Sequence, residues 1–276
     1  MKIKLPLLLV TPLLALGTAR ADILSTGFDG AASQSGIMFD VVGTAPLRLE
    51  ALQFAPLTST VSGNVEIYTK AGTHVGFAAN PGAWTSLGIY PYPAGAAGAA
   101  RPPVTLNTPI VLAAGERRAF YIRDLAVDLR HAAGDGTGTL EAADQNLVLL
   151  EGTAVSGTFT SAFIGRIPNV ALHYETDFLP PTVTVVGPRT TRTSSTRATI
   201  FGLAQDDTQV ATVRAKYRRA TAKGLGPRVT KNIVPAASGL FRLNLRLAPG
   251  RNAVTFQAID GEGRTSPVTR ATVIRR

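Results

Sequence analysis

The sequence predicts an all-β protein that consists of two β-sandwich domains. Two observations indicate this class: apolar and polar residues alternate in most segments, and turn-forming Gly and Pro separate these segments. The chain has 276 residues, with 27 Gly and 18 Pro. A chain of this length is sufficient for two domains that each bury their own hydrophobic core.

The first 21 residues have the pattern of a cleaved secretory signal peptide. Lys2 and Lys4 form a positive n-region, residues 5–16 form an apolar run, and residues 19–21 form an A-x-A cleavage site. The apolar run is too short to span a bilayer, and no later segment approaches 18 apolar residues. We therefore predict an exported protein that is periplasmic, cell-surface or extracellular, with no transmembrane segment after cleavage.

The chain contains no cysteine. Exported eukaryotic domains of this size usually carry disulfides, so their absence favours a bacterial envelope or extracellular protein. The absence of thiols also excludes cysteine nucleophiles, zinc–thiolate sites and iron–sulfur clusters. No motif in the sequence indicates a cofactor, and we predict none.

Charge divides the chain into an acidic and a basic part. Residues 22–176 contain eight Lys and Arg against thirteen Asp and Glu, whereas residues 177–276 contain seventeen against five. A segment with a net charge of +12 attracts polyanions, which in an exported protein include anionic polysaccharides and other envelope polymers. The alternative is that these cations are a solvated surface that keeps the domain soluble.

Residues 22–176 are predicted to form the first β-sandwich. The segment at 124–133 is interpreted as a strand followed by a loop, and 94–103 as a Gly/Ala loop that ends in a diproline. The segments with the clearest strand patterns are PLRLEALQF (46–54), NVEIYTK (64–70), RRAFYIRDL (117–125), NLVLLEG (146–152) and NVALHYE (169–175).

A proline linker at 177–181 is predicted to lead into a second domain at 182–276. Diproline favours extended backbone and cannot donate to a sheet ladder. Seven strand segments follow, which is the count of an immunoglobulin-like sandwich. They are TVTVV (182–186), RATIFGLA (197–204), VATVRAKYRR (210–219), RVTKNIV (228–234), LFRLNLRL (240–247), NAVTFQA (252–258) and VTRATVI (268–274).

Residues 180–276 resemble the bacterial immunoglobulin-like (fibronectin-III-like) modules of exported surface proteins. The resemblance lies in PPTVTVVGP, IFGLAQDD and LAPGRNAVTFQAIDGEGRTSP. Residues 28–176 more loosely resemble an uncharacterised β-sandwich domain of bacterial secreted proteins, through MFDVV, VEIYTKAG, NPGAWTSLG, LAAGERRAFYI, DQNLVLLEGT and NVALHY, in this order. Both resemblances imply a β-sandwich and no specific activity.

The stretch at 68–88 contains Trp84, the single tryptophan of the chain. One interpretation is a carbohydrate site, in which Trp84, Tyr90 and Tyr92 stack on sugar rings and Asn80 bonds their hydroxyls. The other interpretation is structural: KAGT is a hairpin turn, HVGF the returning strand, and NPG a second turn. Trp84 then packs at the edge of the core, which we favour because Trp is usually buried.

Two glycine-containing loops invite a ligand hypothesis. The DGEG loop contains Asp260 and Glu262, and Asp206 and Asp207 lie in another loop of the same domain, which suggests a calcium site. We favour the simpler interpretation that Asp260 caps its turn, and we predict no metal. The GDGTG loop at 134–138 lacks the strand-then-helix context of a phosphate loop.

Enzymatic and nucleic-acid signals are weak. His74, His131 and His173 form no metal-binding spacing, and no G-x-S-x-G elbow is present. We predict no enzyme, with a glycan-active enzyme that uses paired carboxylates as the alternative. Tyr217 and Phe201 are the available base-stacking residues of the basic domain, so no specific nucleic-acid partner is predicted.

The predicted function is that of a non-catalytic, exported surface or matrix protein with a role in adhesion. Its basic module would bind an anionic envelope or extracellular polymer through alternating cations on two strands. The alternative is a carbohydrate-binding module that uses the aromatic residues near Trp84. The cations predicted to bind the polymer are Arg214, Lys216, Arg218, Arg242 and Arg246.

Overall fold

The structure is a computed structural model that describes residues 22–58, 60–160, 162–221 and 224–276. The predicted signal peptide at 1–21 lies outside the described residues. The described chain is all-β except for one short 3-10 helix, η1 (Pro81–Ala83), and none of its helices is long and apolar enough to cross a membrane. It divides into two compact units, 22–178 and 179–276, and this division falls within the predicted linker.

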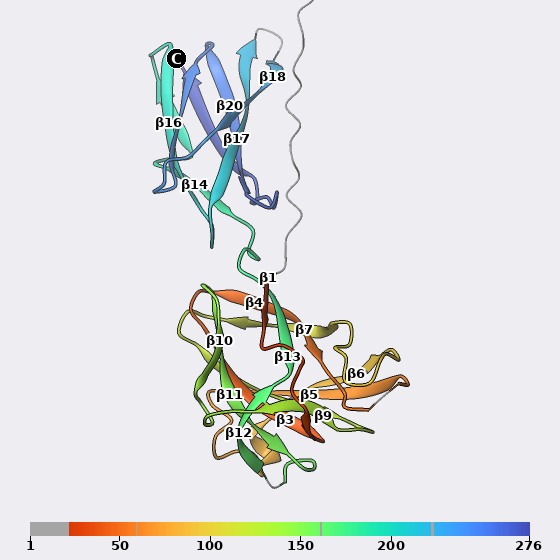
Figure 1. The fold of residues 1–276 in the computed structure, drawn as a ribbon. Coiled ribbons are helices and arrows are strands. Elements are labelled where there is room, and N and C mark those ends of the chain that lie inside the picture. Colours follow the sequence, from red (N-terminus) through yellow and green to blue (C-terminus); the bar gives the residue numbers. More distant parts are fainter. Residues whose placement is uncertain (1–21, 59, 161, 222–223) are drawn as a thin grey trace, which may run out of the picture. The chain divides into compact units, whose positions relative to one another are not determined.

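The first unit is a β-sandwich of two antiparallel sheets (Figure 1). The smaller sheet has the order β1-β13-β4-β7, and the larger has the order β2-β9-β12-β11-β3-β8-β5-β6, with β10 paired to β11. The strands are β1 (Asp22–Ser25), β2 (Ala32–Gln34), β3 (Gly36–Gly43), β4 (Leu47–Phe54), β5 (Gly63–Ala71), β6 (Thr85–Tyr92), β7 (Val104–Leu112), β8 (Arg117–Asp124), β9 (Leu129–Ala133), β10 (Leu140–Ala143), β11 (Leu147–Val155), β12 (Ala162–Pro168) and β13 (Val170–Glu175).

The main core of this unit lies between the two sheets. Alternation along β3 directs Ile37, Phe39 and Val41 into it, and the Phe39 ring stacks on Phe120 of β8 at a centroid distance of 5.9 Å. Met38 of β3 points the other way and belongs to a second cluster with Trp84. The middle of the larger sheet is therefore buried on both faces, as the continuous apolar run NLVLLEG indicates.

The five strands predicted with the clearest patterns are all present, but two local predictions are wrong. HVGF is not a strand, and KAGT is not the hairpin turn: β5 ends at Ala71, residues 72–84 form a loop that contains η1, and the returning strand is β6. In 124–133 the order is loop then strand, because Asp124 Oδ1 accepts hydrogen bonds from the N–H groups of Ala126 and Val127 and so closes a turn after β8. The strand in that segment is β9.

The second unit has the strand order of an immunoglobulin-like sandwich. One sheet has the order β14-β16-β19, and the other has the order β15-β21-β20-β17-β18. The strands are β14 (Thr182–Val186), β15 (Thr190–Thr193), β16 (Arg197–Gln205), β17 (Val210–Thr221), β18 (Gly224–Ile233), β19 (Leu240–Arg246), β20 (Gly250–Asp260) and β21 (Thr269–Arg275). All seven predicted strands are present, and β15, which pairs in parallel with β21, is additional.

The core of the second unit lies between these sheets, so their outer faces point in opposite directions. Phe241, Leu243 and Leu245 of β19 are buried, and the Phe241 ring meets Phe256 of β20 at a centroid distance of 5.4 Å. The residues that alternate with them point outward. This arrangement decides which of the predicted cations can act together.

Candidate polyanion-binding site

Three predicted cations project from the outer face of β17. Arg214, Lys216 and Arg218 alternate with Val213 and Ala215, which are fully buried in the core. Because side chains of a strand alternate between faces, the three cations form one row. Residues two positions apart on a strand are separated by about 7 Å, and neighbouring strands lie about 5 Å apart.

Sheet register adds further cations to this row. Arg228 of β18 lies opposite Arg218. Thr255 of β20 pairs with Lys216 of β17 on one side and with Arg270 of β21 on the other. Ile274 of β21 is the register partner of both Arg251 on β20 and Arg192 on β15. We call the resulting surface the basic face; its cations are Arg192, Arg214, Lys216, Arg218, Arg228, Arg251 and Arg270.

The basic face has no opposing charge. The five strands contain a single acid, Asp260 at the end of β20, and its side chain is buried. The register positions between the cations hold Thr, Asn, Gln, Ala and Ile. None of the seven cations makes an ion pair with a residue that the structure describes. An array of uncompensated guanidinium and ammonium groups suits carboxylate, sulfate or phosphate groups.

The remaining predicted cations, Arg242 and Arg246, lie on β19 in the other sheet. Arg246 is opposite Arg197 of β16, and Arg242 is opposite Phe201. Their side chains project from the outer face of the β14-β16-β19 sheet, which is the opposite side of the sandwich. They therefore cannot extend the basic face. The structure thus brings Arg214, Lys216 and Arg218 together and separates them from the β19 pair.

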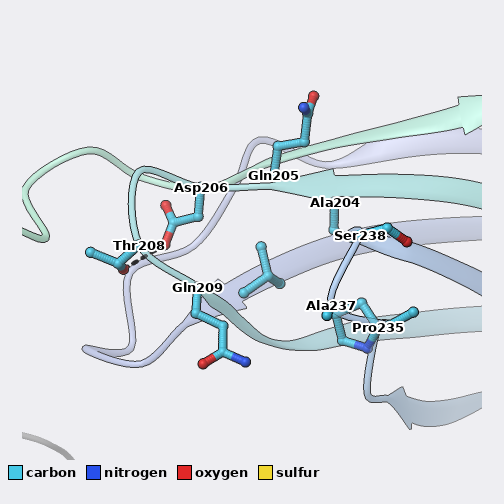
Figure 2. Close-up of a pocket in the computed structure, with 11 residues that line it drawn as sticks. Ala204, Gln205, Asp206, Thr208, Gln209, Pro235, Ala237 and Ser238 are labelled. Atoms are coloured by element: carbon cyan, nitrogen blue, oxygen red, sulfur yellow. Dashed lines mark hydrogen bonds between the residues drawn. The ribbon is translucent and has the colours of Figure 1, made fainter.

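Of the acids considered for a calcium site, Asp260 caps its own turn, and Asp206 and Asp207 accept hydrogen bonds from other residues of the second unit. Asp260 Oδ1 accepts a hydrogen bond from the Arg264 N–H at 2.7 Å, as expected for a turn cap, and Asp207 accepts one from the Leu179 N–H at 3.2 Å. Asp206 lines a polar hollow of about 250 Å³ (Figure 2), and its carboxylate accepts a hydrogen bond from the Thr208 hydroxyl at 3.2 Å.

The GDGTG loop surrounds an internal anion. Glu151 is buried, and its carboxylate accepts hydrogen bonds from the N–H groups of Asp135 at 3.0 Å and Gly136 at 2.8 Å. The loop amides therefore already hold a carboxylate of the protein. Nearby Glu141 has a raised pKa because of burial and the negative charges of Glu151 and Asp135.

The structure does not offer the predicted sugar platform. Trp84, Tyr90 and Tyr92 are 8%, 5% and 2% exposed, and Asn80 is the exposed member of the set. Tyr90 and Tyr92 face the core between the sheets, whereas Trp84 packs on the outer side of the larger sheet. The rings therefore lie on opposite sides of one sheet. The indole N–H of Trp84 donates a hydrogen bond to the Phe77 carbonyl at 3.1 Å and so holds the ring against its own loop.

A buried acid–imidazole–hydroxyl network lies in the first unit, and sequence spacing did not indicate it. Asp40 Oδ1 is 2.7 Å from His74 Nδ1, and His74 Nε2 is 3.2 Å from Thr153 Oγ1. Burial alone would raise the pKa of Asp40, but the hydrogen bonds and electrostatic field of His74 outweigh it and lower that pKa. All three side chains are at most 4% exposed, so no substrate reaches the hydroxyl in this conformation.

No family model matches the chain, and a search of curated proteins finds none similar to it. Solved structures with some likeness include fibronectin(III)-like modules of Clostridium thermocellum CbhA, at 11% identity, covering 84% of this chain and 86% of that one, with a TM-score of 0.27. A tetra-tandem repeat of a large adhesion protein is 12% identical over 93% of this chain and 71% of that one, at a TM-score of 0.28.

A β-glucuronidase from Ruminococcus gnavus is 10% identical, with a TM-score of 0.20. The match covers 88% of this chain but 36% of the glucuronidase, so the chain spans about a third of that enzyme.

Proposed function

We propose that the protein is an exported, non-catalytic surface or matrix protein whose second unit binds an anionic polysaccharide or envelope polymer. The observation that carries this proposal is the basic face, on which seven outward cations in register have no acid among them. The signal-peptide pattern and the absence of cysteine support export from a bacterial cell.

A repeating ligand fits such a face better than a single small anion. One exposed ion pair contributes at most about 1 kcal/mol, whereas a polymer engages several cations at once. Arg predominates over Lys on this face, and its planar fork binds carboxylate, sulfate or phosphate in a bidentate manner. Polymer length and salt concentration are therefore expected to govern affinity.

The non-catalytic part of the proposal rests on the first unit. The Asp40–His74–Thr153 network orients a hydroxyl, but the three side chains pack in the interior. Its contacts join the 72–84 loop to β3 and β11. This is the role of a structural clamp.

The test compares polymer binding by two variants with equal loss of charge. Arg214→Gln/Lys216→Gln/Arg218→Gln removes the β17 row, and Arg197→Gln/Arg242→Gln/Arg246→Gln removes three cations from the other sheet. Binding to heparin and to polygalacturonate is measured by titration calorimetry. We expect the first variant to lose at least about tenfold in affinity and the second to lose much less. Equal losses would show that net charge, and not the basic face, attracts the polymer.

A further inference from the structure

The outer face of the β14-β16-β19 sheet differs from the basic face because large apolar side chains project from it. Phe201 of β16 is 54% exposed, and Leu240 of β19 is 53% exposed. Val186 of β14 and Val234, which follows β18, are also exposed. We call these four residues the apolar patch. By contrast, the register positions of the basic face hold one large apolar residue, Ile274, which is half-buried.

The four residues belong to one continuous surface. Phe201 is the register partner of Val186 on one side and of Arg242 on the other, and Leu203 pairs with Leu240 in the next row. Phe201, Val234, Leu240 and Arg242 also line a single open cleft of about 590 Å³. This volume lies within the range of about 300–1,000 Å³ found for small-molecule sites.

Cations accompany the apolar patch, and no acid does. Arg242 lies at the cleft, and Arg246 of the same strand face is opposite Arg197. Strands β14, β16 and β19 contain no Asp or Glu. None of the three arginines makes an ion pair with a described residue. Like charges directly opposite each other in a sheet are destabilising, so an anion between Arg197 and Arg246 would relieve a cost of the free protein.

We infer that this face docks on an anionic lipid surface. Phe201, Val234 and Leu240 enter the headgroup region, while Arg242, Arg246 and Arg197 contact lipid phosphates. Monomeric soluble proteins rarely expose contiguous apolar clusters without a partner, and apolar residues flanked by cations are typical of interfacial membrane binding. The side chains of the apolar patch offer no hydrogen-bonding group to a hydrophilic polymer. The inference goes beyond the proposed function, because it concerns the opposite sheet and stands if polymer binding fails.

The test is co-sedimentation of the chain from Asp22 onward with phospholipid vesicles. One set contains phosphatidylcholine alone, and the other contains three parts phosphatidylcholine to one part phosphatidylglycerol. The variants are Phe201→Ser/Leu240→Ser and Arg242→Gln/Arg246→Gln, with Arg214→Gln/Lys216→Gln on the basic face as the matched control. We expect binding to the anionic vesicles alone, a loss of about tenfold or more for both test variants, and a smaller loss for the control.

A second variant that gains a fluorescence signal tests the inference even if the serine variant does not fold. Phe201→Trp keeps the patch apolar and adds a fluorophore on it, while Trp84 is buried in the first unit. Anionic vesicles should shift its emission to the blue and leave the emission of the parent chain unchanged. Three results would overturn the inference: no shift, vesicle binding by Phe201→Ser/Leu240→Ser equal to the parent, or gel filtration that shows a dimer dissociated by that variant. The last would assign the patch to a second copy of the chain.

Discussion

His74 Nδ1 lies 2.7 Å from Asp40 Oδ1, and both side chains are 1% exposed. The same carboxylate oxygen accepts the backbone N–H of His74 at 2.9 Å. On its other side, the imidazole reaches Thr153 of β11. One histidine thus ties the long loop that follows β5 to two neighbouring strands of the larger sheet, and Trp84 at the end of that loop covers the same sheet.

Removal of the Asp40 carboxylate is expected to destabilise the first unit strongly. Asp40→Ala leaves two buried N–H groups of His74 without their acceptor, and breaking a buried pair of this kind costs about 3–5 kcal/mol. Urea unfolding followed by Trp84 fluorescence measures the loss. Asp29→Asn, an exposed acid of the same unit, is the control. A variant within about 0.5 kcal/mol of the parent would show that the clamp is dispensable.

The emission of Trp84 is expected to be blue-shifted and weakly quenched by acrylamide, because the indole packs against Tyr121 and Phe159 and is 8% exposed. A panel of neutral and acidic glycans should leave the spectrum unchanged. Trp84→Ala should cost about 3–5 kcal/mol through the cavity it creates. A red-shifted, quenchable emission that sugars protect would instead restore the sugar-platform hypothesis.

Strand patterns are local, and this explains which parts of the fold could be predicted. Alternation identifies β4 and β19 because one face of each is buried and the other is not. β15 could not be found this way, since TTRT is polar throughout and its pairing with β21 depends on residues far along the chain. HVGF was misassigned because Val75, although β-branched, is exposed in a loop that His74 anchors.

The candidate site was predictable to the same extent. Because side chains alternate between the two faces of a strand, the spacing along β17 places Arg214, Lys216 and Arg218 on one face without any knowledge of the fold. The addition of Arg228 and Arg270 requires the sheet register, which a single sequence does not contain. The Asp40–His74–Thr153 network joins residues 34 and 79 positions apart from the histidine, so no spacing motif reveals it.

Acid should weaken the first unit through His131. Burial lowers the pKa of this imidazole below 6.5, although a backbone hydrogen bond to Ala132 opposes the shift, and its Nε2 has no partner among the described residues. The unfolded chain therefore binds the proton first. The contribution of neutral His131 to the free energy of unfolding is therefore present above pH 6.5. It is lost as the pH falls toward the pKa of His131 in the folded protein.

Urea unfolding between pH 8 and pH 5 measures this effect. His131→Leu should flatten part of the pH dependence. It should not abolish the dependence, because burial also lowers the pKa of His173. An unchanged slope in His131→Leu would contradict the assignment. Asp40 acts in a separate range, since its lowered pKa places its contribution above 3.8 and its loss below that value.

A single methyl group at Gly152 should disrupt the larger sheet. A Cβ there would lie 1.9 Å from the backbone oxygen of Met38, and backbone cannot move aside cheaply. The glycine stands at a bulge in β11, where register shifts toward both β3 and β12. Gly152→Ala is therefore expected to cost about 1–3 kcal/mol or more. Gly82→Ala, whose added Cβ meets nothing closer than 3.6 Å, should change stability by less than about 0.5 kcal/mol in the same urea assay.

The cations of the basic face are expected to lower the stability of the free second unit and to increase its affinity for the polymer. Arg218 and Arg228 are opposite each other on β17 and β18, and like charges in this position repel. Arg228→Glu replaces the repulsion with attraction, so it should stabilise the free second unit by about 0.2–1 kcal/mol while it weakens polymer binding. Thermal unfolding by circular dichroism and the salt concentration that elutes the protein from a heparin column measure the two effects.

Arg228→Gln separates removal of the repulsion from the new attraction. It should give a smaller gain in melting temperature than Arg228→Glu and a smaller decrease in elution salt. A polymer that binds across Arg218 and Arg228 should raise the melting temperature of the parent more than that of either variant. The polymer neutralises the repulsion in the parent, whereas both variants have already lost it. If Arg228→Glu elutes at the same salt concentration as the parent, then β18 does not contribute to the polymer site, and the site is confined to β15, β17, β20 and β21.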